Sequence, residues 1–379
     1  MPTETMTAME RMEAAVRLEP LDRIPCAPLM DIYFPSKYKG FTTLEGLSDW
    51  KRGFYSIVDV FDELGGWDGM LLPGYSITTT PHVYSGVTFG KNLIPGLDLE
   101  GNVTTQFDEQ EVITRVDYDD IINLGWNGFK VKHKNRVNPA PEEKIIAWSE
   151  RQIGRFKTEI DVWKKKGIRS LIGAMTLSPL MILSTARSLM EITKDIYQIP
   201  DKLEAVMDAM VDDLIADAIE AAKITEEPGV MLTMERGGGF YYPLHIYEKF
   251  EYPHMKKMVE AFAAEDLITI MHLDQDYTLN LPYFKDLPAK MVVAELDSTT
   301  DIFKAKEILK GHMCIAGDVP AALTTLGTPE EVETYCKKLI DVVGQDSGFI
   351  LSTGCTLPVD CKIENLKAMV DTAKNYYPH

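Results

Sequence analysis

Eight short apolar runs, mostly separated by stretches with helical periodicity, limit the fold of this sequence more than any other feature. Continuous apolar runs of this length are typical of buried strands in a parallel sheet that is covered by helices. About eight such units in 379 residues predict a single (β/α)8 TIM-barrel domain spanning residues 1–379. A doubly wound open sheet is the alternative. The runs are IPCAPLMD (Ile24–Asp31), DGMLLPG (Asp68–Gly74), SLIGAMT (Ser170–Thr176), VMLTMERGGG (Val230–Gly239), LITIMH (Leu267–His272), MVVAELD (Met291–Asp297), MCIAGDV (Met313–Val319) and FILSTGC (Phe349–Cys355).

Helical periodicity is clearest between Asp201 and Ile224. Apolar residues recur there at steps of three and four, and the opposite face carries Asp and Glu. Pro200 stands near the expected start of this helix, where proline is tolerated. We also expect helices over residues 149–166, 247–264, 330–343 and 362–376.

The stretch from about residue 81 to about residue 144 does not fit the repeating pattern. It is rich in Gly, Asn and Asp and includes GVTFGKNLIPGLDLEGNVTTQFDEQE. We interpret it as a long insertion in the N-terminal half of the barrel, after an early strand. Loops at the C-terminal face of a barrel carry function, so the insertion is either part of a lid over the site or a surface decoration.

The charge of the chain excludes several classes of partner. Nucleic-acid binding needs a basic surface, but the formal net charge is −19 and no basic cluster is larger than KVKHKNR (Lys130–Arg136). An anionic membrane surface is excluded for the same reason. No apolar run approaches the roughly 18 residues of a membrane-spanning helix, and the acidic N-terminal stretch does not resemble a signal peptide. The five cysteines are irregularly spaced, which indicates free thiols. We expect a cytoplasmic protein.

Polar residues close the apolar runs, and in a barrel the catalytic groups come from the C-terminal ends of several strands. The segment LITIMHLDQDY ends in His272, Asp274 and Asp276. Alternate residues of a strand point to the same side, so these side chains can project together into one space. The polar residues that we assign to the other runs are Asp31, Asp68, Glu235, Glu295, Asp318 and Cys355.

Four of these residues are of types that bind a divalent metal. His272 and Asp274 end one strand, Glu295 ends the next, and Cys355 ends the last. Zinc accepts such a mixed set of nitrogen, oxygen and sulfur ligands in tetrahedral geometry. We predict that these four residues bind zinc. The alternative is a polar cluster held together by hydrogen bonds alone.

Two further predictions concern the remaining strand ends. We predict that Asp31 and Glu235 are catalytic carboxylates. The loop ERGGGF follows one strand, and its glycines would let a large planar ligand approach the backbone. The loop lacks the GxGxxG spacing and the P-loop lysine, which disfavours a nucleotide. We therefore predict cofactor binding by the three glycines, Gly237, Gly238 and Gly239.

Two stretches of the chain resemble the uroporphyrinogen decarboxylase superfamily. RMEAAVRLEPLDRIPCAPLM, from Arg11, is similar to the opening of these proteins, and GFILSTGCTLPVDCKIENLKAMVDTAKNY, from Gly348, is similar to their closing strand, loop and helix. The resemblance covers nearly the whole chain and implies a (β/α)8 barrel. The decarboxylases hold porphyrinogen carboxylates with an early arginine-rich loop. The corresponding stretch here, LMDIYFPSKYKG, contains no arginine, which disfavours a decarboxylase.

The cobalamin-dependent methyltransferases of the superfamily carry a zinc site instead. Its pattern is His-x-Cys at one strand end, an acidic residue at the next, and a cysteine in the closing Gly-Cys motif. This sequence is similar at His272, Glu295 and Cys355, whereas Asp274 stands where the thiol-activating members have cysteine. A carboxylate in place of a thiolate hardens the site and favours an oxygen ligand. The chain then looks most like the O-demethylase methyltransferases, whose insertion is similar to the stretch Phe89–Trp126.

This resemblance implies a zinc-dependent methyltransferase that moves a methyl group from a methoxylated, often aromatic, small molecule to cob(I)alamin. The sequence contains no Asp-x-His-x-x-Gly signature of a corrinoid-binding domain, so the cobalamin is expected on a separate corrinoid protein. One alternative is a methyltransferase that passes the methyl group from methylcobalamin to a thiol (coenzyme M) or to tetrahydrofolate. Others are a decarboxylase-like lyase and a non-catalytic binder of a tetrapyrrole or corrinoid. The sequence leaves open whether the protein forms a homodimer.

Overall fold

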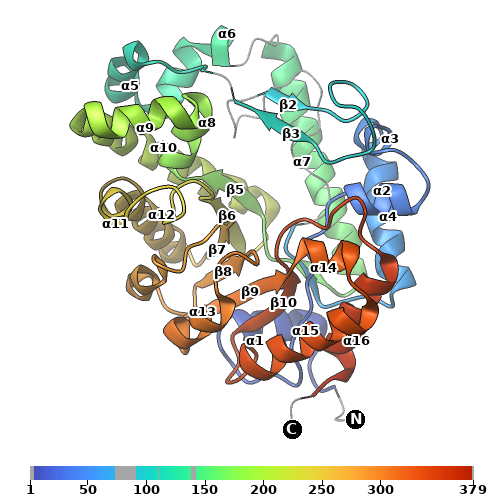
Figure 1. Cartoon of the computed structure of the whole chain (residues 1–379). Helices are drawn as coiled ribbons and strands as arrows, with labels where there is room; N and C mark the ends of the chain where they lie inside the picture. The colour runs from blue at the N-terminus through green and yellow to red at the C-terminus, as the bar shows by residue number, and fades with distance from the viewer. Residues whose placement is uncertain (1–3, 73–90, 110, 138–141, 378–379) are drawn as a thin grey trace.

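The computed structural model describes residues 4–72, 91–109, 111–137 and 142–377. Its centre is a ring of parallel strands with helices outside it (Figure 1). Six of the strands form a continuous parallel sheet in the order β10–β9–β8–β7–β6–β5. Their bounds are β5 Ala174–Leu177, β6 Gly229–Thr233, β7 Ile268–Leu273, β8 Val292–Leu296, β9 Cys314–Val319 and β10 Phe349–Thr353.

The early part of the chain completes the ring. β1 (Gly69–Met70) pairs in parallel with β4 (Arg169–Ser170), which belongs to the same apolar run as β5. Cys26 bridges to Leu351 of β10, and its carbonyl accepts a hydrogen bond from the amide of Asp68, next to β1, at 2.8 Å. The sheet therefore closes on itself. This confirms the predicted (β/α)8 barrel, and each of the eight apolar runs contributes described residues to its wall.

Alternation along the strands decides which side chains face the barrel interior. Ile268 and Ile270 of β7 belong to the apolar cluster inside the barrel, whereas Met271 and Leu273 pack against the surrounding helices. His272 has the same parity as Ile270, so its side chain also faces inward, at the C-terminal end of the strand. On neighbouring strands an interior apolar residue is likewise followed two positions later by a polar one, in the pairs Met231–Thr233, Val293–Glu295 and Ile350–Ser352.

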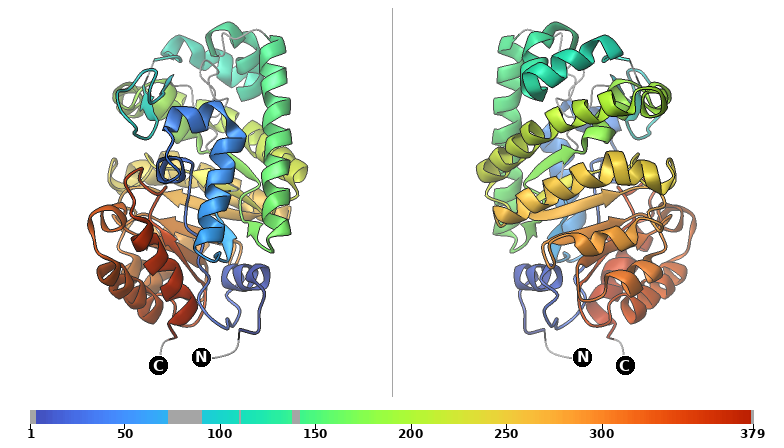
Figure 2. Two further views of the ribbon diagram at one scale, coloured as in Figure 1. Left: turned by 90° about the vertical axis from the view of Figure 1, so that its right-hand side faces the viewer. Right: turned by 90° about the vertical axis from the view of Figure 1, so that its left-hand side faces the viewer.

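Helix α1 (Ala8–Val16) closes the opposite end of the barrel. Met12, Ala15 and Val16 of this helix belong to the interior cluster. The buried Arg11 binds Asp68 at 2.5 Å. In Figure 2 this helix lies at the end of the molecule where both termini are found. Apolar side chains thus fill the barrel from below, and polar groups gather at its C-terminal mouth.

The outer helices lie where the sequence predicts them. The helix predicted from Asp201 to Ile224 is α10, and its first turns bury Leu203 and Val206. The segment predicted as one helix over 247–264 contains a π-helical turn, Tyr247–Glu251, before α12 begins. The remaining barrel helices and connecting helices are α2 (Tyr33–Tyr38), α3 (Thr43–Ser48), α4 (Trp50–Glu63), α7 (Glu142–Lys165), α8 (Pro179–Ala186), α9 (Leu189–Gln198), α10 (Pro200–Thr225), α11 (Leu244–Ile246), α12 (Tyr252–Ala264), α13 (Ile302–Leu309), α14 (Ala321–Leu326), α15 (Pro329–Val342) and α16 (Ile363–Asn375).

The predicted insertion lies between β1 and α7, far from the termini (Figure 1). Its residues 81–90, 110 and 138–141 are outside the described part of the chain. The rest forms an antiparallel pair of strands and two helices, of which the longer packs against α10 through the buried Trp126 and Phe129. These elements are β2 (Lys91–Leu93), β3 (Gln106–Asp108), the 3-10 turn Arg115–Asp117, α5 (Tyr118–Lys132) and α6 (Lys134–Val137).

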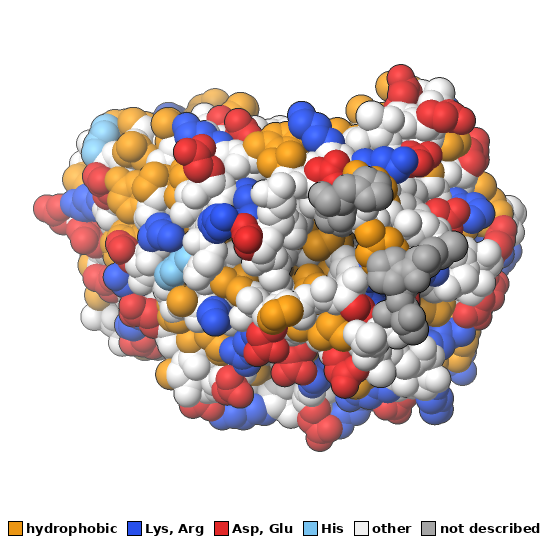
Figure 3. All heavy atoms as spheres, turned by 90° about the horizontal axis from the view of Figure 1, so that it is seen from below, with side chains coloured by type: hydrophobic (Ala, Val, Ile, Leu, Met, Phe, Trp, Pro, Cys, Tyr) orange, Lys and Arg blue, Asp and Glu red, His pale blue; other side chains and the backbone are white. Residues whose placement is uncertain are grey.

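The surface carries charges of both signs. Figure 3 shows the molecule from below relative to Figure 1, and on this face Lys and Arg side chains are interspersed with Asp and Glu. This face offers no continuous basic area to a polyanion. None of the helices in the described ranges combines the length and the apolar character that crossing a membrane requires.

Candidate metal centre

Three side chains at the mouth of the barrel come close enough to share one cation. They are His272 and Asp274 at the end of β7, and Cys355 after β10, and one ligand atom of each lies within 4.8 Å of the other two. Nε2 of His272 is 3.5 Å from Oδ1 of Asp274. The thiol of Cys355 donates a hydrogen bond to Oδ2 of Asp274 at 3.6 Å. The structure therefore brings together three of the four residues for which we predict zinc binding.

The local backbone explains why Cys355 reaches this position. Gly354 precedes it, and the amide of Gly354 donates a hydrogen bond to the carbonyl of Val319 on β9 at 3.0 Å. A Cβ atom on Gly354 would lie 3.2 Å from the backbone of Asp297 and Ser298, which follow β8. The absence of a side chain lets the closing loop cross the neighbouring strand ends. Steric contact with the neighbouring backbone thus explains why a glycine precedes Cys355.

The donor atoms fit a zinc ion. With bonds of about 2.0–2.3 Å in tetrahedral geometry, pairs of ligand atoms lie about 3.3–3.8 Å apart. The distance of 3.5 Å from Nε2 of His272 to Oδ1 of Asp274 and that of 3.6 Å from Sγ of Cys355 to Oδ2 fall in this range, at the two oxygens of the same carboxylate. Oδ1 of Asp274 is buried and has no hydrogen-bond partner among the described residues. A buried carboxylate oxygen without a donor is costly unless a cation faces it. Either a protonated His272, whose Nε2 is 3.5 Å away, or a bound metal ion would supply that charge.

Glu295 lies behind the imidazole instead of beside the other three groups. β7 and β8 pair in a register that sets His272 opposite Glu295, and Oε2 of Glu295 is hydrogen-bonded to Nδ1 of His272. A carboxylate in this position fixes the orientation and the tautomer of a metal-binding histidine and leaves Nε2 free to bind. The structure therefore differs from our prediction of four equivalent ligands, because Glu295 is placed to orient His272.

The charges around His272 favour a cation at Nε2. Burial alone would lower the pKa of His272, but Glu295 and Asp274 together raise it well above its usual value. Burial alone would raise the pKa of Asp274, but His272 lowers it below its usual value. Burial raises the pKa of the Cys355 thiol. A positive charge is thus stabilised between the two carboxylates.

Glu235, one of the predicted catalytic carboxylates, faces the same space from the end of β6. Its Oε1 is 4.0 Å from Nε2 of His272, and 29% of its side chain is exposed. Burial of the carboxyl raises its pKa. Glu235 stays outside the group of three close donors, so its position suits contact with a substrate better than binding of the metal.

Asp31, the other predicted catalytic carboxylate, lies at the turn into α2. Its Oδ1 accepts a hydrogen bond from the amide of Ile32 at 2.6 Å. The nearby Leu29 donates through its amide to Oγ1 of Thr353 on β10 at 3.1 Å and accepts through its carbonyl from the amide of Leu357. The segment that carries Asp31 therefore runs beside the loop that carries Cys355, at the same end of the barrel.

The three glycines for which we predict cofactor binding lie against side chains of the protein itself. A Cβ atom on Gly237 would lie 2.6 Å from the side chain of Glu251, and one on Gly238 would lie 2.8 Å from the ring of Tyr277. The amide of Gly239 donates a hydrogen bond to Oδ1 of Asn280 at 2.9 Å. The structure gives Gly237 and Gly238 a packing role, and cofactor binding by the three glycines stays a prediction.

Two other strand-end candidates lie apart from the centre. Asp68 stands at the start of β1, where it binds Arg11 and Arg23 near the closed end of the barrel, so the prediction that it closes a strand is wrong. Asp318 is in β9 and accepts a hydrogen bond from the hydroxyl of Tyr335 at 2.8 Å. Burial raises the pKa of Asp318 to about 7. Both residues have protein partners that account for them.

Sequence reasoning missed two polar contacts behind the centre. Oε2 of Glu251 accepts a hydrogen bond from the hydroxyl of Ser178 at 3.1 Å, and Nη1 of Arg236 is paired with Oε1 of Glu109 at 2.5 Å. The only local signal for either is the run of glycines after Arg236, which shows that this loop is held by few side chains.

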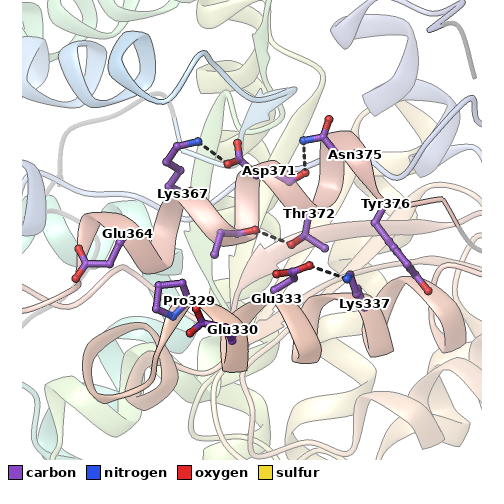
Figure 4. Close-up of a pocket in the computed structure, with 11 residues that line it drawn as sticks. Pro329, Glu330, Glu333, Lys337, Glu364, Lys367, Asp371, Thr372, Asn375 and Tyr376 are labelled. Atoms are coloured by element: carbon purple, nitrogen blue, oxygen red, sulfur yellow. Dashed lines mark hydrogen bonds and ion pairs between the residues drawn. The ribbon is translucent and has the colours of Figure 1, made fainter. Parts of the chain in front are cut away.

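A groove of about 510 Å³ lies away from the metal centre, on the outer wall of the barrel. Figure 4 shows that it is lined by residues of α15 and α16. Four of its charged side chains pair within their own helices, Glu333 with Lys337 and Lys367 with Asp371, and Glu330 and Glu364 also line it. We assign no ligand to this groove.

Comparisons with known proteins agree with this architecture. The sequence matches the family described as Uroporphyrinogen decarboxylase (URO-D) over residues 138–376. The methylcobamide:CoM methyltransferase MtbA of Methanosarcina mazei is 32% identical over 132 residues, which are 35% of this chain and 37% of the relative. The protein of the same name from Methanosarcina acetivorans is 33% identical over 132 residues, with the same shares. A uroporphyrinogen decarboxylase of Coxiella burnetii is 30% identical over 81 residues, 21% of this chain and 22% of that protein.

These matches are partial in length, and the chain spans 37% of the MtbA proteins. A solved structure described as a methyltransferase from Methanosarcina mazei aligns over 98% of this chain and 99% of that chain with a TM-score of 0.71 and 15% identity, which supports the fold. The MtbA relatives also agree with the resemblance to the methyltransferase branch of the superfamily. Since the family match covers well over half of the sequence, the chain belongs to the uroporphyrinogen decarboxylase (URO-D) family.

Proposed function

We propose that this protein is a zinc-dependent methyltransferase that takes the methyl group of a methoxylated, often aromatic, small molecule and passes it to the cob(I)alamin of a separate corrinoid protein. The observation that carries the proposal is the close group of His272, Asp274 and Cys355, in which Oδ1 of Asp274 is buried and accepts no hydrogen bond among the described residues. The MtbA relatives, whose name refers to methylcobamide, support methyl transfer that involves a corrinoid.

The residues of the centre would have different roles. His272, Asp274 and Cys355 would hold the zinc ion, and Glu295 would keep the imidazole of His272 turned towards it. Zinc bound here would supply Lewis-acid chemistry, on the order of several kcal/mol of stabilisation for negative charge that develops on an oxygen. Glu235 faces the same space and would contact the substrate.

Asp274 favours a methyl group that is bound to oxygen. Thiolate-rich zinc sites suit a thiolate ligand, and a carboxylate in place of one thiolate makes the site harder. An aryl methyl ether is a difficult donor, because its leaving group is a phenolate whose conjugate acid has a pKa near ~10. Such a substrate gains most from a centre that stabilises the departing oxygen.

A second candidate function is methyl transfer from methylcobalamin to a thiol. The observation in its favour is the printed name of the MtbA relatives, which refers to CoM. Asp274 counts against it, because the carboxylate reduces the sulfur content of the site. A decarboxylase is disfavoured because the stretch after the first strand lacks arginine.

The experiment is a pair of assays on one purified, metal-analysed preparation. In the first, the protein is mixed with a reduced corrinoid protein and a panel of methoxylated compounds, and formation of methylcobalamin is followed by absorbance. In the second, methylcobalamin is mixed with coenzyme M or tetrahydrofolate. We expect about one zinc ion per chain and activity in the first assay. Full activity in a metal-free preparation would refute the proposal, and activity in the second assay alone would favour the second candidate.

A further inference from the structure

Between Glu235 and Phe240, Arg236 is the only residue with a side chain. Arg236 is followed by three glycines before Phe240. Glu235 itself has no hydrogen-bond partner in the described part of the chain, and its nearest charged neighbour is His272 at 4.0 Å. The position of the Glu235 carboxyl is therefore set by the backbone of this loop.

Contacts from the segment that follows β7 hold one side of the loop. The ring of Tyr277 packs on Gly238, and Asn280 accepts the amide hydrogen of Gly239. The hydroxyl of Tyr277 also donates a hydrogen bond to the carbonyl of Met234, the residue before Glu235. These contacts therefore hold Met234 and the glycines, and Arg236, the residue after Glu235, is held by other partners.

Arg236 anchors the other side of the loop through its side chain. Its Nη1 lies 2.5 Å from Oε1 of Glu109 and donates a hydrogen bond to the carbonyl of Ser184 in α8 at 3.2 Å. Oε2 of Glu109 accepts a hydrogen bond from the amide of Leu189 at the start of α9 at 3.1 Å. Glu109 follows β3 directly. One carboxylate thus joins the insertion, helix α9 and the loop of the metal centre.

We propose that Arg236 is a positioning residue, which holds the carboxyl of Glu235 beside the metal centre by fixing its loop to Glu109 of the insertion. Only 19% of the Arg236 side chain is exposed, so the ion pair is screened less by water than a surface pair. Both contacts come from one nitrogen, Nη1, and a lysine ammonium also carries more than one donor on its nitrogen, so Arg236→Lys should keep part of this hold. The effect on catalysis rests on the proposed function, whereas the effect on the loop does not.

The same segment of the insertion offers a matched control. Glu111 is two residues beyond Glu109 and is also paired with an arginine, Arg187. Arg187 binds Asp195 of α9 and is not part of the loop that carries Glu235. Loss of the Glu111 pair removes a similar charge interaction from the insertion without touching the loop.

The experiment compares Arg236→Gln, Arg236→Lys, Glu109→Gln and Glu111→Gln with the wild type in two measurements. The first is amide hydrogen exchange of peptides that cover residues 234–241, made on the zinc-loaded full chain. The second is kcat and KM for methyl transfer, with zinc content determined for each variant. We expect Arg236→Gln and Glu109→Gln to speed exchange in this loop and to lower kcat about tenfold, with KM changed less than about twofold and zinc retained. Arg236→Lys should recover part of kcat, and Glu111→Gln should match the wild type.

Two results would overturn the inference. One is wild-type exchange in the loop for both Arg236→Gln and Glu109→Gln. The other is an equal effect of Glu111→Gln, which would mean that the insertion as a whole is loosened. If the wild type shows no methyl transfer, the proposed function fails, and the exchange measurement still decides the role of Arg236.

Discussion

His272 on β7 and Glu295 on β8 are register partners, and the carboxylate of Glu295 is hydrogen-bonded to Nδ1 of His272. The bond turns Nε2 towards Asp274, 3.5 Å away. Both side chains face inward because they share the parity of apolar residues inside the barrel. The orientation of the imidazole is thus a consequence of strand pairing, and removal of Glu295 tests whether this orientation matters.

Glu295→Gln should weaken zinc binding about 10–100-fold without unfolding the protein, because the amide keeps the shape of the side chain and loses its charge behind the imidazole. Zinc affinity is measured by competition with a chromophoric chelator. Glu260→Gln, on the exposed face of α12, serves as the control. Unchanged affinity in Glu295→Gln would show that Glu295 does not support His272.

Cys355→Ala should leave the purified protein with little zinc, since it removes the sulfur of the three-residue group. Cys361→Ala is the matched control, because Cys361 lies in the same closing segment and its thiol donates to the carbonyl of Lys362. We expect Cys361→Ala to keep about one zinc ion per chain. Metal analysis decides, and equal zinc in the two variants would exclude Cys355 as a ligand.

Asp274→Cys should keep zinc but lose rate with a methyl ether, because a second thiolate softens the site. The variant should gain relative activity with a thiol acceptor. The ratio of the two activities is compared with that of the wild type in the assays described above. Identical ratios would refute the argument from ligand hardness.

Gly238→Ala should destabilise the protein by about 1–3 kcal/mol, the usual effect of overpacking. The added methyl group would lie 2.8 Å from the fully buried ring of Tyr277. Gly239→Ala is the milder comparison, with its nearest atom, Oδ1 of Asn280, at 3.2 Å. Free energies of unfolding come from urea titration. If Gly238→Ala is as stable as the wild type, the packing role is refuted, and the prediction that these glycines bind a cofactor is favoured.

Glu251 should make the protein less stable as the pH rises. Burial raises the pKa of this carboxyl from 4.5 to about 8. Between these values the native protein keeps a proton that the unfolded chain has released. The free energy of unfolding therefore falls with rising pH, by at most about 1.4 kcal/mol per pH unit.

Glu251→Gln should remove this slope, because the amide stays neutral at every pH. The variant should match the wild type near pH 4 and exceed it in stability at pH 8. Urea titrations at several pH values measure both. Parallel pH profiles for the two proteins would show that Glu251 is not the group responsible.

The barrel could be predicted from the sequence because its strands are continuous apolar runs between amphipathic helices. β7 is buried along its whole length, and so is β8. One run, Ser170–Thr176, contains the end of β4 and the start of β5, which pair with different neighbours. β4 pairs with β1 and β5 pairs with β6, and this change of partner within one run depends on how the sheet closes. No local sequence pattern predicts it.

Part of the metal centre could be predicted for a similar reason. His272 and Asp274 follow from the two-residue period of a strand, and Cys355 from its place after the last strand. The role of Glu295 depends on the register between β7 and β8, which neither strand encodes alone. The contact of Ser178 with Glu251 joins residues 73 apart in sequence, so only the folded chain shows it.

The hydrogen bond between Leu29 and Thr353 joins positions 324 residues apart and connects the segment after Cys26 to the last strand, β10. During synthesis on the ribosome, His272 and Asp274 emerge long before Cys355 does. A nascent chain therefore already contains His272 and Asp274 at a stage when Cys355 has not yet been translated. A metal ion that requires all three ligands binds only after the last strand has joined the barrel. Metal binding would therefore mark the completion of folding.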